Sequence, residues 1–448
     1  MLGYELSLAL RGLRRFPRST VLVVVTVALG IASCMTSLLL LHVLSGDPLP
    51  GRSQHLYLAW VDTLHRAPRV DDSDMALNGV TVNTFGYRRM KRDDAEALMR
   101  GRAGVRQAIV ADALADESTA DGRRRLAAQV VLETSSDFVA LFDVPLLHGR
   151  SWTAAEEAAR APVVMIDSDT AQRFYGSVDA VGREIRLGKR IYRIIGVFAP
   201  YAPQPHFFGL DVGSFTGKGG ENLLVPYTSA LANGLMPMTG DGCDAGVDVS
   251  QTGASDPAHC AALSLWVQLG TPGQVADYRT YLRAYADDHP GDRGTTTAAR
   301  YGLYGVRQWL DMNGVVPTSA RLNVLMASSF LLLCMFNVIG LLTARFLRRS
   351  TEIGIRRALG ASRLAVFAQH IGEATLVCLA GGLLALPMTE LGAWILRRQG
   401  DDFSPLVRSD QWMFGALFAI AIVVGIVVGI VPAWRASTVE PGLQVKSE

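Results

Sequence analysis

The stretch TEIGIRRALGASR, Thr351 to Arg363, lies between two long apolar runs near the C-terminal end of the 448-residue chain. Its mixture of arginines and aliphatic residues predicts a short amphipathic helix. Glu352 stands in the first turn, where the helix dipole favours a negative charge, and four residues before Arg356, a spacing that allows an ion pair. Gly360 is able to end the helix. A short helix at this position divides the C-terminal apolar region into separate spans.

This predicted helix has a small apolar face. Ile355 and Leu359 share one side of it, with Ile353 and Ala358 at the margins. Apolar anchors at this spacing are typical of a helix that docks in a groove of another protein. The alternative is a basic loop that lies on anionic lipid headgroups. The predicted docking residues are Glu352, Ile353, Ile355, Arg356, Arg357, Ala358, Leu359 and Gly360.

Four apolar runs are long enough to cross a bilayer, which takes about 20 residues. The first is longer than the roughly 7–15 apolar residues of a signal peptide, so we expect it to remain in the membrane. A polar segment long enough for a folded domain separates the first two runs. The predicted spans are residues 21–44, 321–344, 364–396 and 412–434, and the domain is residues 45–320.

Flanking charges predict the orientation of the spans, because cytoplasmic loops carry an excess of Lys and Arg. Four arginines precede the first span in the amphipathic segment 1–20, and six lie in the segment 345–363. The short loop 397–411 has balanced charges. Both termini, including the tail 435–448, and the segment 345–363 are therefore predicted to be cytoplasmic. Residues 45–320 are predicted to lie outside.

Strand-like and helix-like segments alternate within the predicted outer domain. Runs rich in β-branched residues predict strands at 124–135, 161–169, 189–200 and 262–270. Apolar residues at helical spacing predict helices at 94–101, 169–176 and 274–289. We therefore expect four transmembrane α-helices with a large α+β extracytoplasmic domain between the first and second. This domain is predicted to have two subdomains and an insertion rich in Gly and Asp at about 201–261.

The five cysteines fit this layout. Cys34, Cys334 and Cys378 fall inside spans, where they act as small apolar residues. Cys243 and Cys260 lie in the outer domain, in a compartment that permits a disulfide. A bridge between them would hold a Gly/Asp-rich loop and have no catalytic role, and the alternative of two free thiols stays open.

Glu373 is the ionisable residue to examine inside the membrane, because buried charges there are costly and usually face protein or water. It is expected to pair with an arginine of the segment 345–363 or to meet a dimer partner, and a proton relay is a further alternative. Gly425 and Gly429 form a Gly-x-x-x-Gly motif, which permits close helix contact but is common by chance.

Nucleotide-binding and catalytic motifs are missing from the sequence. A P-loop needs Gly-x-x-x-x-Gly-Lys-Ser/Thr, and the nearest stretch, GSFTGKGG from Gly213, has neither the spacing nor the hydroxyl. The eight histidines are scattered, DGCDAGVDV (Asp241 to Val249) lacks the spacing of a Ca²⁺ loop, and no Gly-x-Ser-x-Gly elbow is present. The chain is therefore predicted not to be an enzyme and to hold no cofactor or metal. The net charge of +2 does not indicate a nucleic-acid partner, and none is expected.

Four stretches resemble one membrane-protein family. Ser135 to Phe198 is similar to the periplasmic domain of MacB-type transporter subunits, with a segment ending in Gly-Arg, an acidic helix start, a Val/Ile strand and the run VGREIRLGKRIYRIIGV. ENLLVPYTSAL, Glu221 to Leu231, continues the likeness. EIGIRRALGAS and the tail VPAWRASTVEPGLQVKSE resemble the FtsX/MacB permease superfamily, although Glu440 replaces the usual Asp and Lys446 stands near the end.

This resemblance implies a non-catalytic permease subunit of an ABC transporter in the bacterial inner membrane. It implies that two permease subunits, a homodimer or a pair of similar paralogues, sit above two cytoplasmic ATPase subunits that bind ATP and Mg²⁺. Nucleotide-driven motion would then act through the docking helix and the first two spans on the periplasmic domain and export a substrate.

A periplasmic adaptor and an outer-membrane channel often join such subunits. The alternatives are an FtsX-like activator of periplasmic cell-wall hydrolases and a permease that extracts lipoproteins. The sequence does not indicate the substrate.

Overall fold

The structure is a computed structural model that describes residues 17–65, 76–77, 80–81, 88–101, 105–208, 222–238, 242–247, 256–291, 300–313, 318–347, 355, 360, 362–398 and 411–437. The chain divides into two compact units, one of Met1–Ser45 with Val316–Glu448 and one of Gly46–Val315. The first contains the membrane helices, and the second is the domain inserted between the first two of them. The predicted fold class is confirmed.

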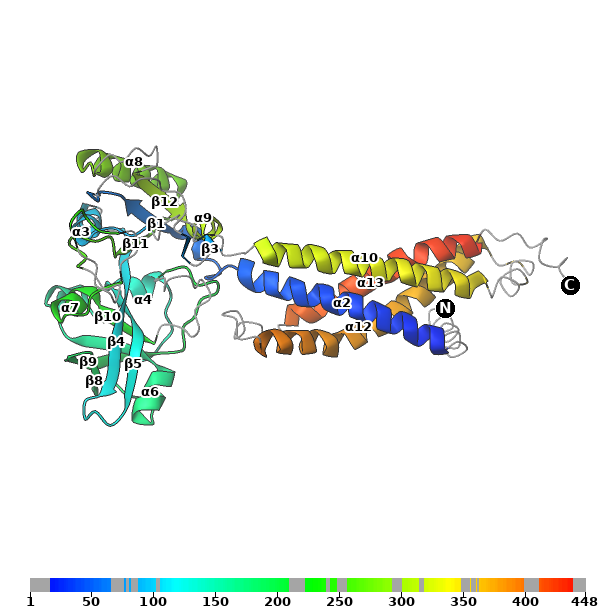
Figure 1. The fold of residues 1–448 in the computed structure, drawn as a ribbon, viewed down its shortest axis with the longest axis horizontal. Helices are drawn as coiled ribbons and strands as arrows, with labels where there is room; N and C mark the ends of the chain where they lie inside the picture. The colour runs from blue at the N-terminus through cyan, green and yellow to red at the C-terminus, as the bar shows by residue number, and fades with distance from the viewer. Residues whose placement is uncertain are drawn as a thin grey trace. The chain divides into compact units, whose positions relative to one another are not determined.

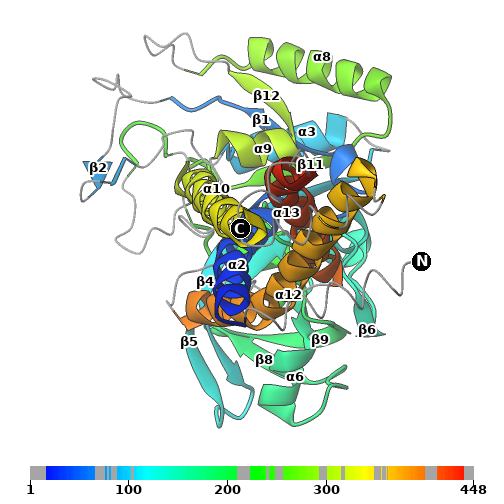
Figure 2. The same ribbon diagram turned by 90° about the vertical axis from the view of Figure 1, so that its right-hand side faces the viewer.

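Four long helices make up the membrane unit, and they run side by side in Figures 1 and 2. Each contains an apolar stretch long enough to cross a bilayer, with ends that agree to within about three residues with the spans predicted from sequence. The helices extend beyond those stretches because their polar flanks remain good helix formers. Their bounds are α2 Pro17–Ser45, α10 Thr318–Leu347, α12 Arg363–Arg398 and α13 Gln411–Ser437.

Small residues set the close packing between α12 and α13. A Cβ atom added at Gly425 would lie 2.7 Å from the Cα of Thr375, and one added at Gly429 would lie 3.0 Å from the Cβ of Ala374. No side chain fits in that space. Glycine at both positions therefore allows α12 to approach α13 closely along the Gly-x-x-x-Gly face. The close contact that this motif permits therefore occurs between two helices of the same chain.

The inserted domain is organised around one ten-stranded sheet. The strand order is β12-β1-β11-β4-β5-β10-β7-β9-β6, with β8 paired to β4 and β9. All pairs are antiparallel except β10 with β5 and β7 with β9. The strands are β1 Leu56–Val61, β4 Gln107–Thr119, β5 Arg125–Thr134, β6 Leu146–Gly149, β7 Val163–Asp167, β8 Glu184–Leu187, β9 Arg190–Phe198, β10 Leu223–Pro226, β11 Ser264–Gln268 and β12 Tyr301–Gly305. A separate two-stranded ladder joins β2 Ala76–Leu77 and β3 Val80–Thr81.

Helices lie between and beside these strands, several of them visible in Figure 1. They are η1 Ser53–His55, α3 Arg92–Gly101, α4 Phe138–Leu141, α5 Ala154–Ala158, α6 Ser168–Tyr175, α7 Tyr227–Ala232, α8 Pro272–Asp288 and α9 Val306–Met312. Reciprocal capping boxes begin α5, through Thr153 and Glu156, and α8, through Thr271 and Gln274. The strands and helices predicted from sequence correspond to β5, β7, β9, β11, α3, α6 and α8 and are confirmed.

Both faces of the central strands are covered by other parts of the domain. The sequences of these strands are therefore apolar at nearly every position. On β4, Ala108 and Val110 pack in one core with Trp266 and Trp309. The alternate residues Ile109 and Ala111 pack in a second core, with residues of α3 and α8. A third core packs β7, β9 and β10 against α6 and α7. The alternation of side chains along each strand thus fills two opposite layers at once.

The predicted insertion at 201–261 contains regular structure where the structure describes it. β10 and the short helix α7 lie within it, and β10 pairs with both β5 and β7 in the main sheet. Residues 209–221, 239–241 and 248–255 of this region lie outside the described residues.

The glycine contact predicts that Gly425→Ala destabilises the membrane unit, because the new methyl group meets the backbone of Thr375. Overpacking of this kind costs roughly 1–3 kcal/mol of the free energy of unfolding. Gly415→Ala is the matched control on the same helix, since nothing lies within 4 Å of its added Cβ. Thermal unfolding of the detergent-solubilised protein measures both, and equal melting temperatures for the two variants would contradict the packing described.

Candidate functional site

The predicted docking helix lies mostly outside the described residues. The residues that the structure does not describe are Glu352, Ile353, Arg356, Arg357, Ala358 and Leu359. Ile355 has helical backbone and a side chain that is 55 % exposed, as a docking residue requires. Gly360 has a φ of +102°, a left-handed value that favours glycine and fits the predicted end of the helix. The docking role itself stays a prediction.

The helix after this segment begins with a cap. The hydroxyl of Ser362 accepts a hydrogen bond of 3.2 Å from the backbone N–H of Ala365, so Ser362 satisfies one of the free donors at the start of α12. The chain from Leu347 to Ser362 is therefore bounded by α10 on one side and a capped α12 on the other.

An ion pair lies between the two helices that flank this segment. Arg345 is in the last turn of α10, and its Nη2 lies 3.1 Å from Oε1 of Glu373 in α12. Both side chains are almost fully buried. Nη1 of Arg345 also donates a hydrogen bond of 3.3 Å to the hydroxyl of Thr20 in α2. The guanidinium thereby contacts polar groups from two other helices.

His370 completes this polar cluster. It is one turn before Glu373 on α12, with Nδ1 3.9 Å from Oε2 of that carboxylate. Its ring packs on Phe346, with 4.2 Å between ring centroids. Residues of α2, α10 and α12 therefore meet at one end of the bundle, beside the segment that carries the predicted docking helix.

Because the cluster is buried, separating its charged groups would cost free energy. Moving two charges out of water costs free energy, and their mutual attraction offsets that cost only when they stay paired. Separating Arg345 from Glu373 would leave each charge buried, so α10 and α12 are expected to move as one piece at this end. Of the roles that the sequence left open for Glu373, the structure shows pairing with an arginine. Sequence reasoning did not single out Arg345, because it placed residue 345 in a loop and not in a helix.

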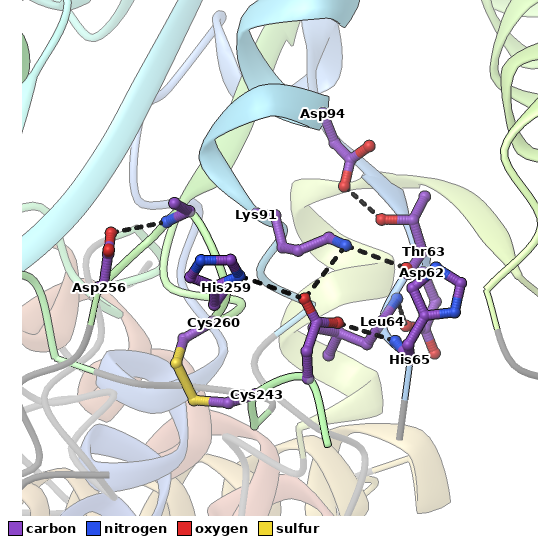
Figure 3. Close-up of polar contacts among 12 residues, drawn as sticks. Asp62, Thr63, Leu64, His65, Lys91, Asp94, Cys243, Asp256, His259 and Cys260 are labelled. Carbon is purple, nitrogen blue, oxygen red and sulfur yellow. Dashed lines mark hydrogen bonds and ion pairs between the residues drawn. A yellow bond between two sulfur atoms is a disulfide. The ribbon is translucent and has the colours of Figure 1, made fainter. Parts of the chain in front are cut away.

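A second polar cluster holds loops of the inserted domain together (Figure 3). Asp244 is its centre: Oδ1 accepts a hydrogen bond of 2.8 Å from the backbone N–H of His65, and Oδ2 lies 3.6 Å from Nζ of Lys91 and 3.8 Å from Nδ1 of His259. The disulfide between Cys243 and Cys260 adjoins it. Four chain segments that are distant in sequence thereby meet.

Nearby contacts show that this cluster is structural. The Thr63 hydroxyl donates to Asp94, and the Tyr285 hydroxyl donates to the same carboxylate at 2.9 Å. Lys91 also donates to the carbonyl of Thr63 at 3.2 Å. Across the part of the chain that the structure describes, no group of three or more His, Cys, Asp or Glu side chains is placed to hold a metal ion. The contacts of Asp244 with His65, Lys91 and His259 carried no sequence signal, because these partners come from other segments of the chain.

The inserted domain also buries carboxyl groups inside its sheet. Glu133 on β5 is fully buried, and neither of its carboxylate oxygens has a hydrogen-bond partner among the described residues. Burial holds the pKa of Glu133 well above its usual range, and the nearby Asp112 raises it further. Asp112 itself pairs with Arg89 at 3.2 Å, with both side chains buried.

Glu117 on β4 is another buried carboxyl group. Burial raises its pKa to about 7, against the opposing charge of Arg173 and with a smaller contribution from Asp167. Near neutral pH, Glu117 therefore changes its protonation state within the folded domain.

Comparisons with known proteins match both units. A family profile described as "MacB-like periplasmic core domain" matches residues 20–284, and one described as "FtsX-like permease C-terminal" matches residues 324–441. "Macrolide export ATP-binding/permease protein MacB 1/2" of Paracoccus denitrificans is 27 % identical over 98 % of this chain and 58 % of its own length. "Macrolide export ATP-binding/permease protein MacB" of Bordetella avium is 25 % identical over 66 % of this chain and 40 % of its own length. The chain thus spans about half the length of the curated relatives it matches.

A solved structure is also similar. The periplasmic region of MacB from Actinobacillus actinomycetemcomitans covers 58 % of this chain and 92 % of its own, at 13 % identity and a TM-score of 0.36.

The ion pair predicts a specific pattern of stability changes. Glu373→Leu leaves the Arg345 guanidinium buried without its carboxylate and is expected to cost about 3–5 kcal/mol of the free energy of unfolding. The double variant Arg345→Met with Glu373→Leu removes both charges and should recover most of that loss. Thermal unfolding in detergent measures the series. A double variant that loses as much as the single variants Glu373→Leu and Arg345→Met combined would show that the residues are not coupled.

Glu117 predicts a pH dependence of the inserted domain. Its folded pKa of about 7 exceeds the ordinary value of 4.5, so the folded state favours the protonated form. The stabilisation is fully present below pH 4.5 and is lost as the pH rises toward 7, by roughly 3 kcal/mol in all. Glu117→Gln should reduce the fall in melting temperature of the full protein between pH 5 and 7, and the buried Glu133 should account for part of the fall that remains. Glu184→Gln, at an exposed position, is the control and should keep the wild-type slope. An unchanged slope in Glu117→Gln would contradict the assignment.

Proposed function

Because this chain belongs to the MacB-like family of ABC transporter permeases, we propose that it is the membrane subunit of an exporter whose ATPase is a separate chain. The observation that carries this proposal is the match of both family descriptions, to residues 20–284 and 324–441, on one chain with four membrane helices. The relatives are named as ATP-binding and permease proteins together, and this chain aligns with 40–58 % of their length. The sequence has no P-loop, so the proposal assigns ATP and Mg²⁺ to the ATPase partner.

The proposed mechanism is mechanical transmission. The docking segment 351–363 would seat in a groove of the ATPase, with Ile355 and Leu359 as apolar anchors. A displacement of this segment acts on α10 and α12 together, because the buried pair of Arg345 and Glu373 joins them. The contact of Arg345 with Thr20 extends the joint to α2. The chain continues from α2 and into α10 through the inserted domain, so motion of these two helices reaches it directly.

Export is favoured over the alternatives by the extent of the MacB-like match. The two relatives compared above are named for macrolide export, and a third, of Pseudomonas syringae pv. tomato, is named a probable syringafactin exporter. Activation of cell-wall hydrolases and lipoprotein extraction remain the competing functions, and the identity of the partners distinguishes them. The proposal does not assign the substrate, and a periplasmic adaptor and an outer-membrane channel are proposed partners.

The four apolar helices and the periplasmic-type domain indicate an inner-membrane protein. The arginines of the segments 1–20 and 345–363 support the proposed orientation, with both termini and the docking segment in the cytoplasm.

Leu359→Asp tests the proposal, because it places a charge in the apolar docking face. It should abolish recovery of an ATPase when the tagged chain is captured from native membranes in mild detergent, and it should abolish stimulated ATP hydrolysis, while the melting temperature stays unchanged. Ser362→Asp adds the same charge three residues away and still caps α12, so it should behave as wild type. An ATPase that binds Leu359→Asp normally would refute the docking assignment. A wild-type chain that recovers no ATPase would refute the proposed function.

A further inference from the structure

Six strands of the inserted domain close into a ring. Starting from β4, the chain of paired strands runs through β5, β10, β7 and β9 to β8, and β8 pairs back to β4. All six strands contribute side chains to one core, together with residues of α6 and α7. In Figure 1, β8 and β9 lie beside the long β4–β5 hairpin. The pairing of β4 with β8 is therefore the contact that turns this part of the sheet into a small barrel.

The contact between β4 and β8, here called the β4–β8 seam, is short. It consists of the pairs Glu117–Leu187, Ser118–Arg186 and Thr119–Ile185. The backbone N–H of Gly188 donates across it to the carbonyl of Asp116 at 2.8 Å. On its other edge β8 has a ladder of four pairs with β9. Separation of the seam therefore opens the ring while β8 stays attached to β9.

Glu117 is the buried acid of this seam. Directly opposed residues of an antiparallel pair share a face, so Glu117 lies on the core side with Leu187. Glu117 is 1 % exposed, and its Oε1 has no hydrogen-bond partner among the described residues. A carboxylate at this position lacks the hydrogen bonds that water would give it, so the closed seam favours the neutral acid.

The charges around Glu117 oppose this preference only in part. Arg173 of α6 favours the charged form, whereas Asp167, which caps the same helix, favours the neutral form. The other ionisable residues next to the seam are Asp116, Arg125, Glu184, Arg186 and Arg190, all of them at least partly exposed. Water and salt screen their charges, so burial dominates and raises the pKa of Glu117 to about 7.

We propose that the β4–β8 seam is a proton-controlled latch, closed while Glu117 is protonated and opened as Glu117 ionises. Opening admits water to the carboxyl group, and the proton leaves to solvent. Rising pH therefore favours the open ring and falling pH the closed one. This opening is local, because the β8–β9 ladder and the rest of the fold stay in place. The latch makes the inserted domain respond to the pH around it, and it depends on neither the ATPase nor the proposed export.

Hydrogen exchange of the full chain in detergent, followed by mass spectrometry, tests the latch. The Gly188 amide reports on the seam. The Gly182 amide is the matched control, because it donates to the carbonyl of Ile194 on β9 at 2.8 Å. After correction for the intrinsic exchange rate, opening at Gly188 should be about 40-fold more frequent at pH 7 than at pH 5. At each pH, Gly182 should exchange more slowly than Gly188.

Two variants assign the pH response to one residue. Glu117→Gln keeps a neutral side chain of nearly the same shape at every pH, so opening at Gly188 should lose its pH dependence. Glu184→Gln removes an ionisable group from β8 itself, at an exposed position, and should keep the wild-type response.

A covalent lock tests the latch with Glu117 in place. Ser118→Cys combined with Arg186→Cys puts two thiols at directly opposed positions, where Cβ atoms are about 4.5–5.5 Å apart. After oxidation, exchange at Gly188 should be slow at both pH values, whereas Ser118→Cys alone should respond as wild type.

Three outcomes would overturn the proposal. The first is equal opening at Gly188 and Gly182 at each pH, which would show that only the whole domain unfolds. The second is a pH response that survives Glu117→Gln, and the third is one that survives the oxidised lock. None of these measurements involves the ATPase, so failure of the proposed function leaves the latch testable.

Discussion

The buried ion pair between Arg345 and Glu373 is the constraint on which the membrane unit depends. Its partners sit where water is excluded, so neither charge can be left alone without a cost of several kcal/mol. The pair ties the last turn of α10 to α12, and Thr20 brings α2 to the same point. The two helices flanking the predicted docking segment thus meet α2 at one polar contact point. The proposed transmission mechanism requires a joint of this kind.

The inserted domain achieves rigidity by other means. Its ten-stranded sheet is covered on both faces in the region of β1, β4 and β11, and the Cys243–Cys260 bridge with Asp244 closes the loops beside it. Under the proposed mechanism the domain receives motion through its two connections, and a stiff domain suits that role, because a soft domain would absorb the displacement locally. The buried Glu117 and Glu133 lower the stability of the folded domain as the pH rises, because the folded state favours their protonated forms.

The membrane spans, their order and the large insertion could be predicted from sequence, because each depends on a local run of residues long enough to cross a bilayer. The same holds for β5, β7, β9 and β11 and for α3, α6 and α8, whose periodicities are intrinsic to their segments. The partner of Glu373 was open among six arginines in the segment 345–363. Choosing Arg345 required knowing that α10 continues through it. Lys91 and Asp244 gave no local sign of their contact, since more than 150 residues separate them along the chain.

The sequence by itself determined which segments enter the membrane, which fold outside it and which family motifs the chain carries, because hydrophobic length and short motifs are properties of contiguous residues. Only the tertiary structure decided which polar groups are satisfied within the chain. It paired Glu373 with Arg345 and joined Asp244 to Lys91. Whether a buried polar group has a partner depends on the approach of distant segments, and that approach is set by packing of the whole bundle or sheet.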